Sequence, residues 1–135
     1  MGAFFGAKIP FADLCGIEFL GVDNGVTRLR VALEEKHGNN SGLPHGGLVA
    51  TLLDIAMGSA ARFASGFPVT TLDMHVSFIA VGDDALTAEG RVTRAGGSIV
   101  FTEAEARDGK GELVAKSSGV FKTRKSEKRS TTDWS

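Results

Sequence analysis

The chain has very little cysteine: Cys15 is the only one among 135 residues. A single thiol excludes an internal disulfide and every cysteine-rich metal site. It is also typical of a reducing compartment, so we expect a cytoplasmic protein. The three histidines, His37, His45 and His75, have no ligand-like spacing, so the sequence predicts no metal site.

The chain also lacks a strong charge of either sign, with a formal net charge of -1. We therefore expect neither a nucleic-acid partner nor a membrane surface. The first sixteen residues have no basic stretch followed by a long apolar run, so we expect no signal peptide, anchor or spanning helix. A phosphate-loop lysine and a nucleophile-elbow serine are missing as well, which excludes two large groups of enzymes.

Proline is scarce, with three residues against eighteen glycines, and the glycines fall between segments with the patterns of regular structure. The pair Asn24-Gly25 favours a tight hairpin turn between two short strands. After the turn and a polar loop, an apolar stretch has the length and composition of one helix. The predicted strands are 17–22, 26–33, 69–81, 85–94, 98–107 and 112–122, and the predicted helix is 48–64.

The segment 69–81 alternates most clearly, with period two. The alternation places Leu72, Met74, Val76 and Phe78 on one face and Thr71, Asp73, His75 and Ser77 on the other. Short glycine-containing turns then join the last three strands as an antiparallel meander.

The predicted helix is apolar on every side, because Asp54 is its only charge before Arg62. Such a helix should be buried. One helix cannot cover both faces of a sheet of five or six strands, so the sheet should wrap around it in an α+β fold. Wrapping leaves open edge strands, and pairing two copies edge to edge would cover them. We therefore expect at least a dimer.

Beyond Phe121 the composition changes to basic and hydroxylated residues, with five Lys and Arg between Lys122 and Arg129. The sequence therefore predicts a single domain over 1–123 and a mobile polar tail over 124–135.

The candidate chemistry is concentrated between Asn39 and Asp54. Gly46 and Gly47 begin the helix, and their uncovered N–H groups at its positive end can hold an anion or a developing oxyanion. The less favoured alternative is that they serve only to let the loop turn and the helix pack closely. His45 precedes them, and its expected role is to support the loop rather than to bind metal or transfer a proton.

Asp54 lies among Leu52, Leu53, Ile55, Ala56 and Met57. A carboxylate in such surroundings must be paired, neutralised or exposed to a cleft. It could be a buried group satisfied by loop N–H groups, or it could attack a carbonyl carbon or activate water. Asp54 is nine positions beyond His45, about 180° around an ideal helix and on the order of 10 Å along it. If both ends serve one reaction, they must come from different subunits.

The segment His45-Gly46-Gly47 followed by Asp54, with Asn39 six residues ahead of His45, resembles the hotdog-fold acyl-CoA thioesterases of the phenylacetic acid degradation (PaaI) type. The resemblance covers residues 11–123, where hairpin, loop, long helix and four-strand meander follow in the family's order. It implies the hotdog fold, in which a curved, mainly antiparallel sheet wraps one long helix. It also implies an acyl-CoA substrate, dimers with a continuous sheet that often pair into tetramers, and no metal or organic cofactor.

The resemblance also implies roles for individual residues. The backbone of Gly46 or Gly47 would polarise the thioester carbonyl, and Asp54 of the partner subunit would be nucleophile or general base. Asn39 would place water or substrate, and His45 would support the loop. Some relatives have a Ser or Thr two residues before an Asp on the strand after the helix, and Thr71 before Asp73 matches that pattern.

Substrate contacts are predicted less directly. Coenzyme A carries phosphates, so the candidate phosphate ligands are Arg62, Arg91, Arg94 and the basic residues after Phe121. Such residues are more often solvated surface charges. Gly96 lies in the turn where relatives approach the pantetheine arm. Phe63, with Phe67 and Phe78, could line the acyl pocket or belong to the core.

Two other functions stay open at this point. A hotdog hydratase or dehydratase would need an acid/base histidine placed with the carboxylate, whereas His45 leads into two glycines. A non-catalytic acyl-CoA-binding module could use the same pocket, and it would be marked by a missing carboxylate or an added regulatory domain. The expected activity is therefore hydrolysis of an aromatic or medium-chain acyl-CoA thioester.

Overall fold

The computed structural model describes residues 3–4 and 7–125. The elements, in chain order, are β1 (Ala3–Phe4), β2 (Ala7–Lys8), α1 (Pro10–Cys15), β3 (Ile17–Asp23), β4 (Val26–Ala32), the 3-10 turn η1 (Glu35–His37), α2 (Gly46–Ser65), β5 (Val69–Phe78), β6 (Ala85–Ala95), β7 (Ile99–Asp108) and β8 (Leu113–Thr123). The six predicted strands and the predicted helix are all present, with ends that differ by up to three residues.

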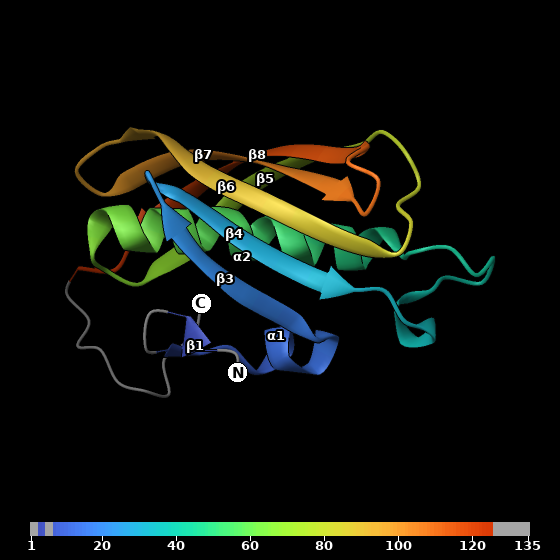
Figure 1. Ribbon diagram of the computed structural model, residues 1–135. Coiled ribbons are helices and arrows are strands. Elements are labelled where there is room, and N and C mark those ends of the chain that lie inside the picture. The colour runs from blue at the N-terminus through green and yellow to red at the C-terminus, as the bar shows by residue number, and fades with distance from the viewer. Residues whose placement is uncertain (1–2, 5–6, 126–135) are drawn as a thin grey trace.

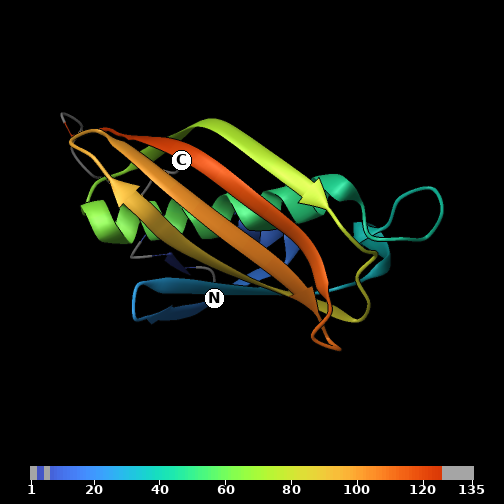
Figure 2. The same ribbon diagram turned by 90° about the horizontal axis from the view of Figure 1, so that it is seen from above.

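The sheet has six strands in the order β3-β4-β6-β7-β8-β5, and every pair is antiparallel (Figures 1 and 2). Only β6, β7 and β8 form the meander that the sequence predicts; β5 pairs with β8 and lies at the far edge, so a four-strand meander is wrong. The reason is the path of α2, which crosses beneath the sheet and delivers the chain to the edge opposite β3. Both β3 and β5 are edge strands.

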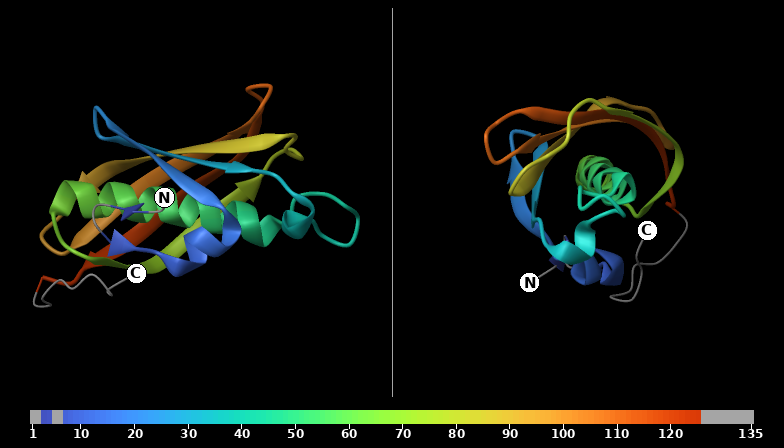
Figure 3. Two further views of the ribbon diagram at one scale, coloured as in Figure 1. Left: turned by 60° about the horizontal axis from the view of Figure 1, so that its bottom comes forward. Right: turned by 90° about the vertical axis from the view of Figure 1, so that its right-hand side faces the viewer.

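Helix α2 lies along the concave side of the sheet, which arches around it when seen along the helix axis (Figure 3, right). Pairs of residues repeating every four positions form the buried stripe: Leu48, Val49, Leu52, Leu53, Ala56, Met57, Ala60 and Ala61. Gly90 in β6 permits the close approach, because a Cβ there would lie 2.4 Å from the carbonyl oxygen of Ala56. A wrapped, curved sheet with one long helix confirms the predicted α+β fold.

One side of α2 is not covered by its own sheet. Thr51, Asp54 and Ile55 are half-buried on this side. Beside it, β5 presents apolar side chains to solvent, with Leu72 54% and Phe78 59% exposed. Helix α2 has the length and apolar character to cross a membrane, but its buried stripe packs into the core cluster with β4, β6, β7 and β8.

A β-bulge changes the predicted faces of β5. Thr71 pairs with Phe121 and Asp73 pairs with Val120, so Leu72 is the extra residue on β5. Strict alternation placed Thr71 on the face opposite Met74, which is wrong, because the bulge turns Thr71 to the helix side, which Met74 also faces. The bulge therefore brings a hydroxyl to α2.

Helix α1 and the turn η1 were not predicted, because they are too short to show helical periodicity. Helix α1 has Pro10 at its first position and ends at Gly16, whose φ of 73° is left-handed. At the other end of the chain, the Arg124 N–H donates to the Pro68 carbonyl over 2.9 Å. The rest of the predicted tail, 126–135, lies outside the described residues.

Candidate functional site

The first turn of α2 is closed by His45. Its backbone is extended, and its Nδ1 accepts the Gly47 N–H over 2.8 Å, so His45 is the N-cap. Its carbonyl oxygen accepts the N–H groups of Leu48 and Val49. Within the described part of the chain, the Gly46 N–H donates to no protein acceptor. Of the two glycine donors that the sequence proposed, Gly47 is occupied and Gly46 is available at the positive end of the helix.

The loop before α2 is anchored by His37, which is buried. Its Nδ1 accepts the Glu34 N–H over 2.9 Å, and its Nε2 lies 2.7 Å from the Cys15 carbonyl oxygen. These partners fix the tautomer that carries its proton on Nε2. The His37 carbonyl then accepts the His45 N–H over 2.8 Å. Sequence reasoning considered His37 only as a metal ligand and missed this role, which no local pattern indicates.

Asn39 shapes the same loop. Its Oδ1 accepts the N–H groups of Ser41 and Leu43 over 2.8 and 3.0 Å. Its own N–H donates to the Leu43 carbonyl, so the loop closes on itself. The side-chain oxygen is therefore engaged, and only the amide N–H groups of Asn39 remain to contact a water or a substrate.

Asp54 lies half-buried on the uncovered side of α2. The Thr71 hydroxyl donates to its Oδ1 over 2.8 Å, across the bulge in β5. Burial raises the pKa of the Asp54 carboxyl above its ordinary value, and the Thr71 hydrogen bond opposes this by favouring the charged form. The second oxygen, Oδ2, accepts no hydrogen bond from the described residues. Such a carboxylate is a stronger base than an exposed one and has a free oxygen to use.

Gly46 and Asp54 of one chain are too far apart to act on one atom. Asp54 is eight positions beyond Gly46 on the helix, which is about 12 Å along the axis. Each also has its own neighbour on β5, since Gly46 lies under the Phe78 ring and Asp54 beside Thr71. The structure thus brings Thr71 to Asp54 and His45 to Gly47, but it does not join the two groups.

The predicted substrate contacts gather at the other end of α2. Arg62 and Phe63 lie in its last turn, which ends at the left-handed Gly66. Arg94 and Gly96 lie at the β6–β7 turn, where the Gly96 N–H donates to the Ile99 carbonyl over 2.8 Å. Arg94 and Phe63 are exposed. These residues are remote from Gly46 of the same chain.

No group of three His, Cys, Asp or Glu within 3–4 and 7–125 is arranged to hold a metal ion. The arrangement offers instead a helix N-terminal donor and a partly desolvated carboxylate. These groups suit acyl transfer, in which a carbonyl oxygen becomes negative while a base activates the attacking group.

Comparison with known proteins identifies the family. The sequence profile of the Thioesterase superfamily matches residues 41–115. A Pseudomonas aeruginosa protein named "Putative esterase" is 37% identical over 118 residues, covering 83% of this chain and 87% of its own length.

Solved structures agree. A Bacillus halodurans protein crystallised with CoA superposes with a TM-score of 0.81 at 26% identity, over 89% of this chain and 82% of its own. The Escherichia coli PaaI protein of the phenylacetic acid degradation operon has the same fold, with a TM-score of 0.79 at 21% identity, over 85% of this chain and 84% of its own. The resemblance drawn from His45-Gly46-Gly47 and Asp54 is confirmed: the chain belongs to the thioesterase superfamily and has its hotdog fold.

Proposed function

We propose that this protein hydrolyses the thioester of an aromatic or medium-chain acyl-CoA to the free acid and CoA. The observation that carries the proposal is the pairing of an available Gly46 N–H with a half-buried Asp54 that has one free oxygen. Membership in the thioesterase superfamily and the CoA bound to the Bacillus halodurans relative support the substrate class.

The chemistry needs both groups at one carbonyl. The substrate's carbonyl oxygen accepts the Gly46 N–H, which stabilises the negative charge of the tetrahedral intermediate. In one route Asp54 takes a proton from water, the oxygen attacks the carbonyl carbon, and the C–S bond breaks as the thiolate is protonated. In the other, Asp54 attacks the carbonyl carbon directly, the C–S bond breaks and CoA leaves as the thiolate, which is then protonated. Water then hydrolyses the mixed anhydride to the free acid and the Asp54 carboxylate. Thr71 holds the carboxylate in place in either route.

Pairing of two subunits along their β5 edges would bring Gly46 of one chain close to Asp54 of the other. On β5, Thr71 lies beside Asp54 and Phe78 beside Gly46. Their partners on β8, Phe121 and Ala115, are six positions apart, so the two residues lie about 20 Å apart along the strand. If two β5 strands pair antiparallel about their midpoint, Phe78 of one lies near Thr71 of the other. The partner subunit's Asp54 then approaches Gly46, and each dimer contains two sites.

The exposed edge favours this dimer. β5 has no partner on its outer side within the described chain, and Leu72 and Phe78 are exposed along it. An open edge with apolar side chains invites pairing. We extend the proposal to a homotetramer built from two such dimers, which is the assembly that the family resemblance implies.

The remaining assignments follow from this arrangement. Asn39 supplies its free amide N–H groups to water or substrate, and His45 orients the donor loop. Arg62, Arg94 and Gly96 of one subunit contact the CoA part of the substrate. Phe63 contacts the apolar acyl part of the substrate. We expect no metal or organic cofactor to be needed, and the single thiol of Cys15 favours the cytoplasm.

Thiol release from a panel of aromatic and fatty acyl-CoA thioesters tests the proposal. We expect the wild type to hydrolyse at least one member. Asp54→Asn should lose at least ~10²-fold in kcat and keep the circular dichroism of the wild type. Thr71→Val should lower kcat less than Asp54→Asn does, because it removes only the hydroxyl and keeps the shape of the side chain.

Binding without turnover is the opposing outcome. If no thioester is hydrolysed but acyl-CoA raises the melting temperature, the protein is an acyl-CoA-binding module. Full activity of Asp54→Asn would remove the carboxylate from the mechanism.

A further inference from the structure

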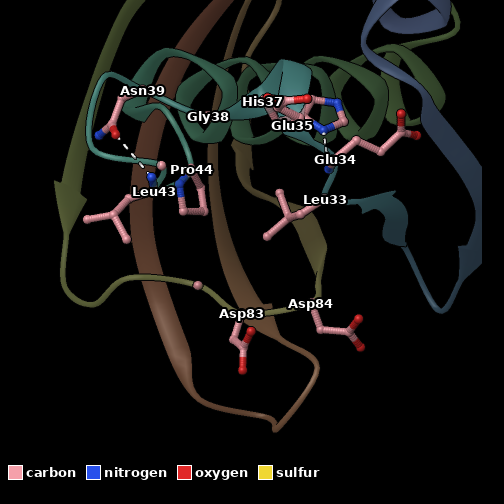
Figure 4. Close-up of a pocket in the computed structure, with 12 residues that line it drawn as sticks. Leu33, Glu34, Glu35, His37, Gly38, Asn39, Leu43, Pro44, Asp83 and Asp84 are labelled. Atoms are coloured by element: carbon pink, nitrogen blue, oxygen red, sulfur yellow. Dashed lines mark hydrogen bonds between the residues drawn. The ribbon is translucent and has the colours of Figure 1, made fainter.

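A pocket of about 470 Å³ lies between the loop that leads into α2 and the segment that leads into β6 (Figure 4). One wall is formed by residues of the first loop, and Gly82, Asp83 and Asp84 form the other. The residues of the first wall are Leu33, Glu34, Glu35, His37, Gly38, Asn39, Gly42, Leu43 and Pro44. We propose that this pocket receives the far end of the acyl group and selects against acyl groups that end in a carboxylate. The proposal rests on the proposed function and adds its substrate preference.

The middle of the pocket is apolar. In Figure 4 the side chains of Leu33, Leu43 and Pro44 lie on the side of the first wall that faces the second. Gly38, Gly42 and Gly82 add surface without side chains. Gly82 has no room for a side chain, because a Cβ there would lie 2.5 Å from the Leu86 side chain. An acyl chain buried there would leave water, which favours apolar chains.

The rim of the pocket is acidic. Glu34, Glu35, Asp83 and Asp84 line it, and no lysine or arginine does. Lys110 lies 3.4 Å from Asp83 and offsets that one charge. In Figure 4 the carboxylates of Glu34, Asp83 and Asp84 point away from the centre, so they surround the apolar part without filling it. A carboxylate at the end of an acyl chain would therefore be surrounded by like charges at the rim.

The pocket also lies where an acyl chain would begin. Pro44 is two residues before Gly46, so their Cα atoms are no more than about 7.6 Å apart. A thioester whose carbonyl is held by the Gly46 N–H thus has the pocket wall within reach of a chain of a few carbons. The wall is held in place by His37 and Asn39, which bond the loop to α1 and to itself.

The test compares two ligands of one shape that differ in charge. Glutaryl-CoA and glutaramoyl-CoA carry a terminal carboxylate and a terminal amide, and their thioether analogues cannot be hydrolysed. We expect calorimetry to show that the wild type binds the amide analogue at least ~10-fold more tightly, and hydrolysis to show the same order in kcat/KM.

The variant E35Q/D84N removes two rim charges at nearly constant volume. Asp84 has a φ of 72°, a conformation that asparagine adopts readily. We expect this variant to bind the two analogues within ~3-fold of each other. Glu103→Gln neutralises a carboxylate on the outer face of β7, away from the pocket, and should keep the wild-type ratio.

Filling the pocket gives a second readout. Leu43→Trp should abolish the gain in affinity from lengthening a neutral acyl chain beyond about six carbons. Leu20→Trp places the same bulk on an exposed position of β3 and should leave the chain-length dependence unchanged.

The outcomes separate this inference from the proposed function. Charge-selective binding without hydrolysis would leave the pocket standing and remove the catalytic assignment. Hydrolysis with equal use of both acyl groups, or a preference that E35Q/D84N does not change, would overturn the pocket. Absence of binding by every acyl-CoA would overturn both.

Discussion

The segments around the two ends of α2 carry charges of opposite sign. Near its N-terminus the pocket rim contributes Glu34, Glu35, Asp83 and Asp84. Near its C-terminus the segments 62–68, 94–99 and 122–125 contain Arg62, Arg94, Lys122, Arg124 and Lys125 and no acidic residue. The backbone joins these segments, since the Arg124 N–H donates to Pro68 and the Thr123 N–H to Ser98.

Under the proposed function, this difference in charge leaves the site of one subunit incomplete. An anionic nucleotide suits the cationic end, whereas a developing oxyanion needs the helix N-terminus, about 30 Å away along α2. Two copies paired antiparallel along β5 would bring each N-terminal end beside the partner's C-terminal end. The charge asymmetry and the open edge therefore point to the same dimer.

The largest expected loss of activity comes from removing the backbone N–H of Gly46 at the N-terminal end of α2. Gly46 is the first helical residue, a position that favours proline, and His45 before it is already extended. Gly46→Pro should thus keep the helix and delete the donor, and kcat should fall ~10²- to 10³-fold.

Gly46→Ala is the control, because it keeps the N–H and its Cβ meets only the Phe78 ring at 3.5 Å. Activity of the proline variant near that of the alanine variant would show that the Gly46 donor takes no part in the reaction.

Mixing two inactive variants tests whether the ends meet across subunits. Asp54→Asn and Gly46→Pro chains, unfolded and refolded together in equal amounts, should form half heterodimers, each with one intact site of two. Recovery of about a quarter of wild-type activity is expected for a shared site. A site within one chain would give no recovery, because every site would carry one defect. Light scattering should show dimers or larger assemblies in each preparation.

The stability of the folded protein should depend on pH through Asp54, which lies in the middle of α2. The raised pKa of Asp54 means that the folded chain holds its proton at pH values where the unfolded chain has released it. Stability contributed by this group is present at low pH and is lost as pH rises above the ordinary value of about 3.9 and through the folded pKa. Asp54→Asn should therefore melt at a higher temperature than the wild type at pH 7, and the difference should shrink towards pH 4.

Asp54 should also set the acid limb of activity, because the proposed reaction requires its deprotonated form. We expect kcat/KM to fall with decreasing pH around a midpoint above about 3.9, and Thr71→Val to move that midpoint upward. A midpoint unchanged in Thr71→Val would mean that the hydroxyl does not stabilise the carboxylate.

The sequence predicted most of the fold because its patterns are local. The six strands, the long helix and the Asn24-Gly25 turn follow from alternation, apolar composition and turn chemistry. The place of β5 beside β8 did not follow, since strand order depends on where α2 delivers the chain. The bulge at Leu72 was also missed, because one inserted residue leaves no signal in a period-two pattern.

Some features of the candidate site could likewise be predicted from local sequence patterns, and others could not. Asp54, His45 and the glycines could be found because a lone carboxylate and paired glycines stand out in an apolar helix. The choice of Gly46 over Gly47 could not be found, since it depends on where the His45 ring points. The roles of His37 and of the Asn39 oxygen depend on hydrogen bonds to backbone atoms, which sequence does not encode directly.

The smallest effects are expected at the cationic end, where charges are exposed and screened. Arg94→Ala should raise KM for acyl-CoA ~3- to 10-fold with little change in kcat, and the effect should shrink at high salt. Ending the chain after Thr123, which removes Arg124 and Lys125, should act in the same direction, whereas ending it after Lys125 should not.

Arg28→Ala, at an ion pair with Glu89 on the outer sheet face, is the matched control. A pantetheine thioester without the nucleotide should be hydrolysed equally by all these chains. If Arg94→Ala slowed that shorter substrate as much as acyl-CoA, the arginine would act on the fold of the β6–β7 turn and not on the phosphates.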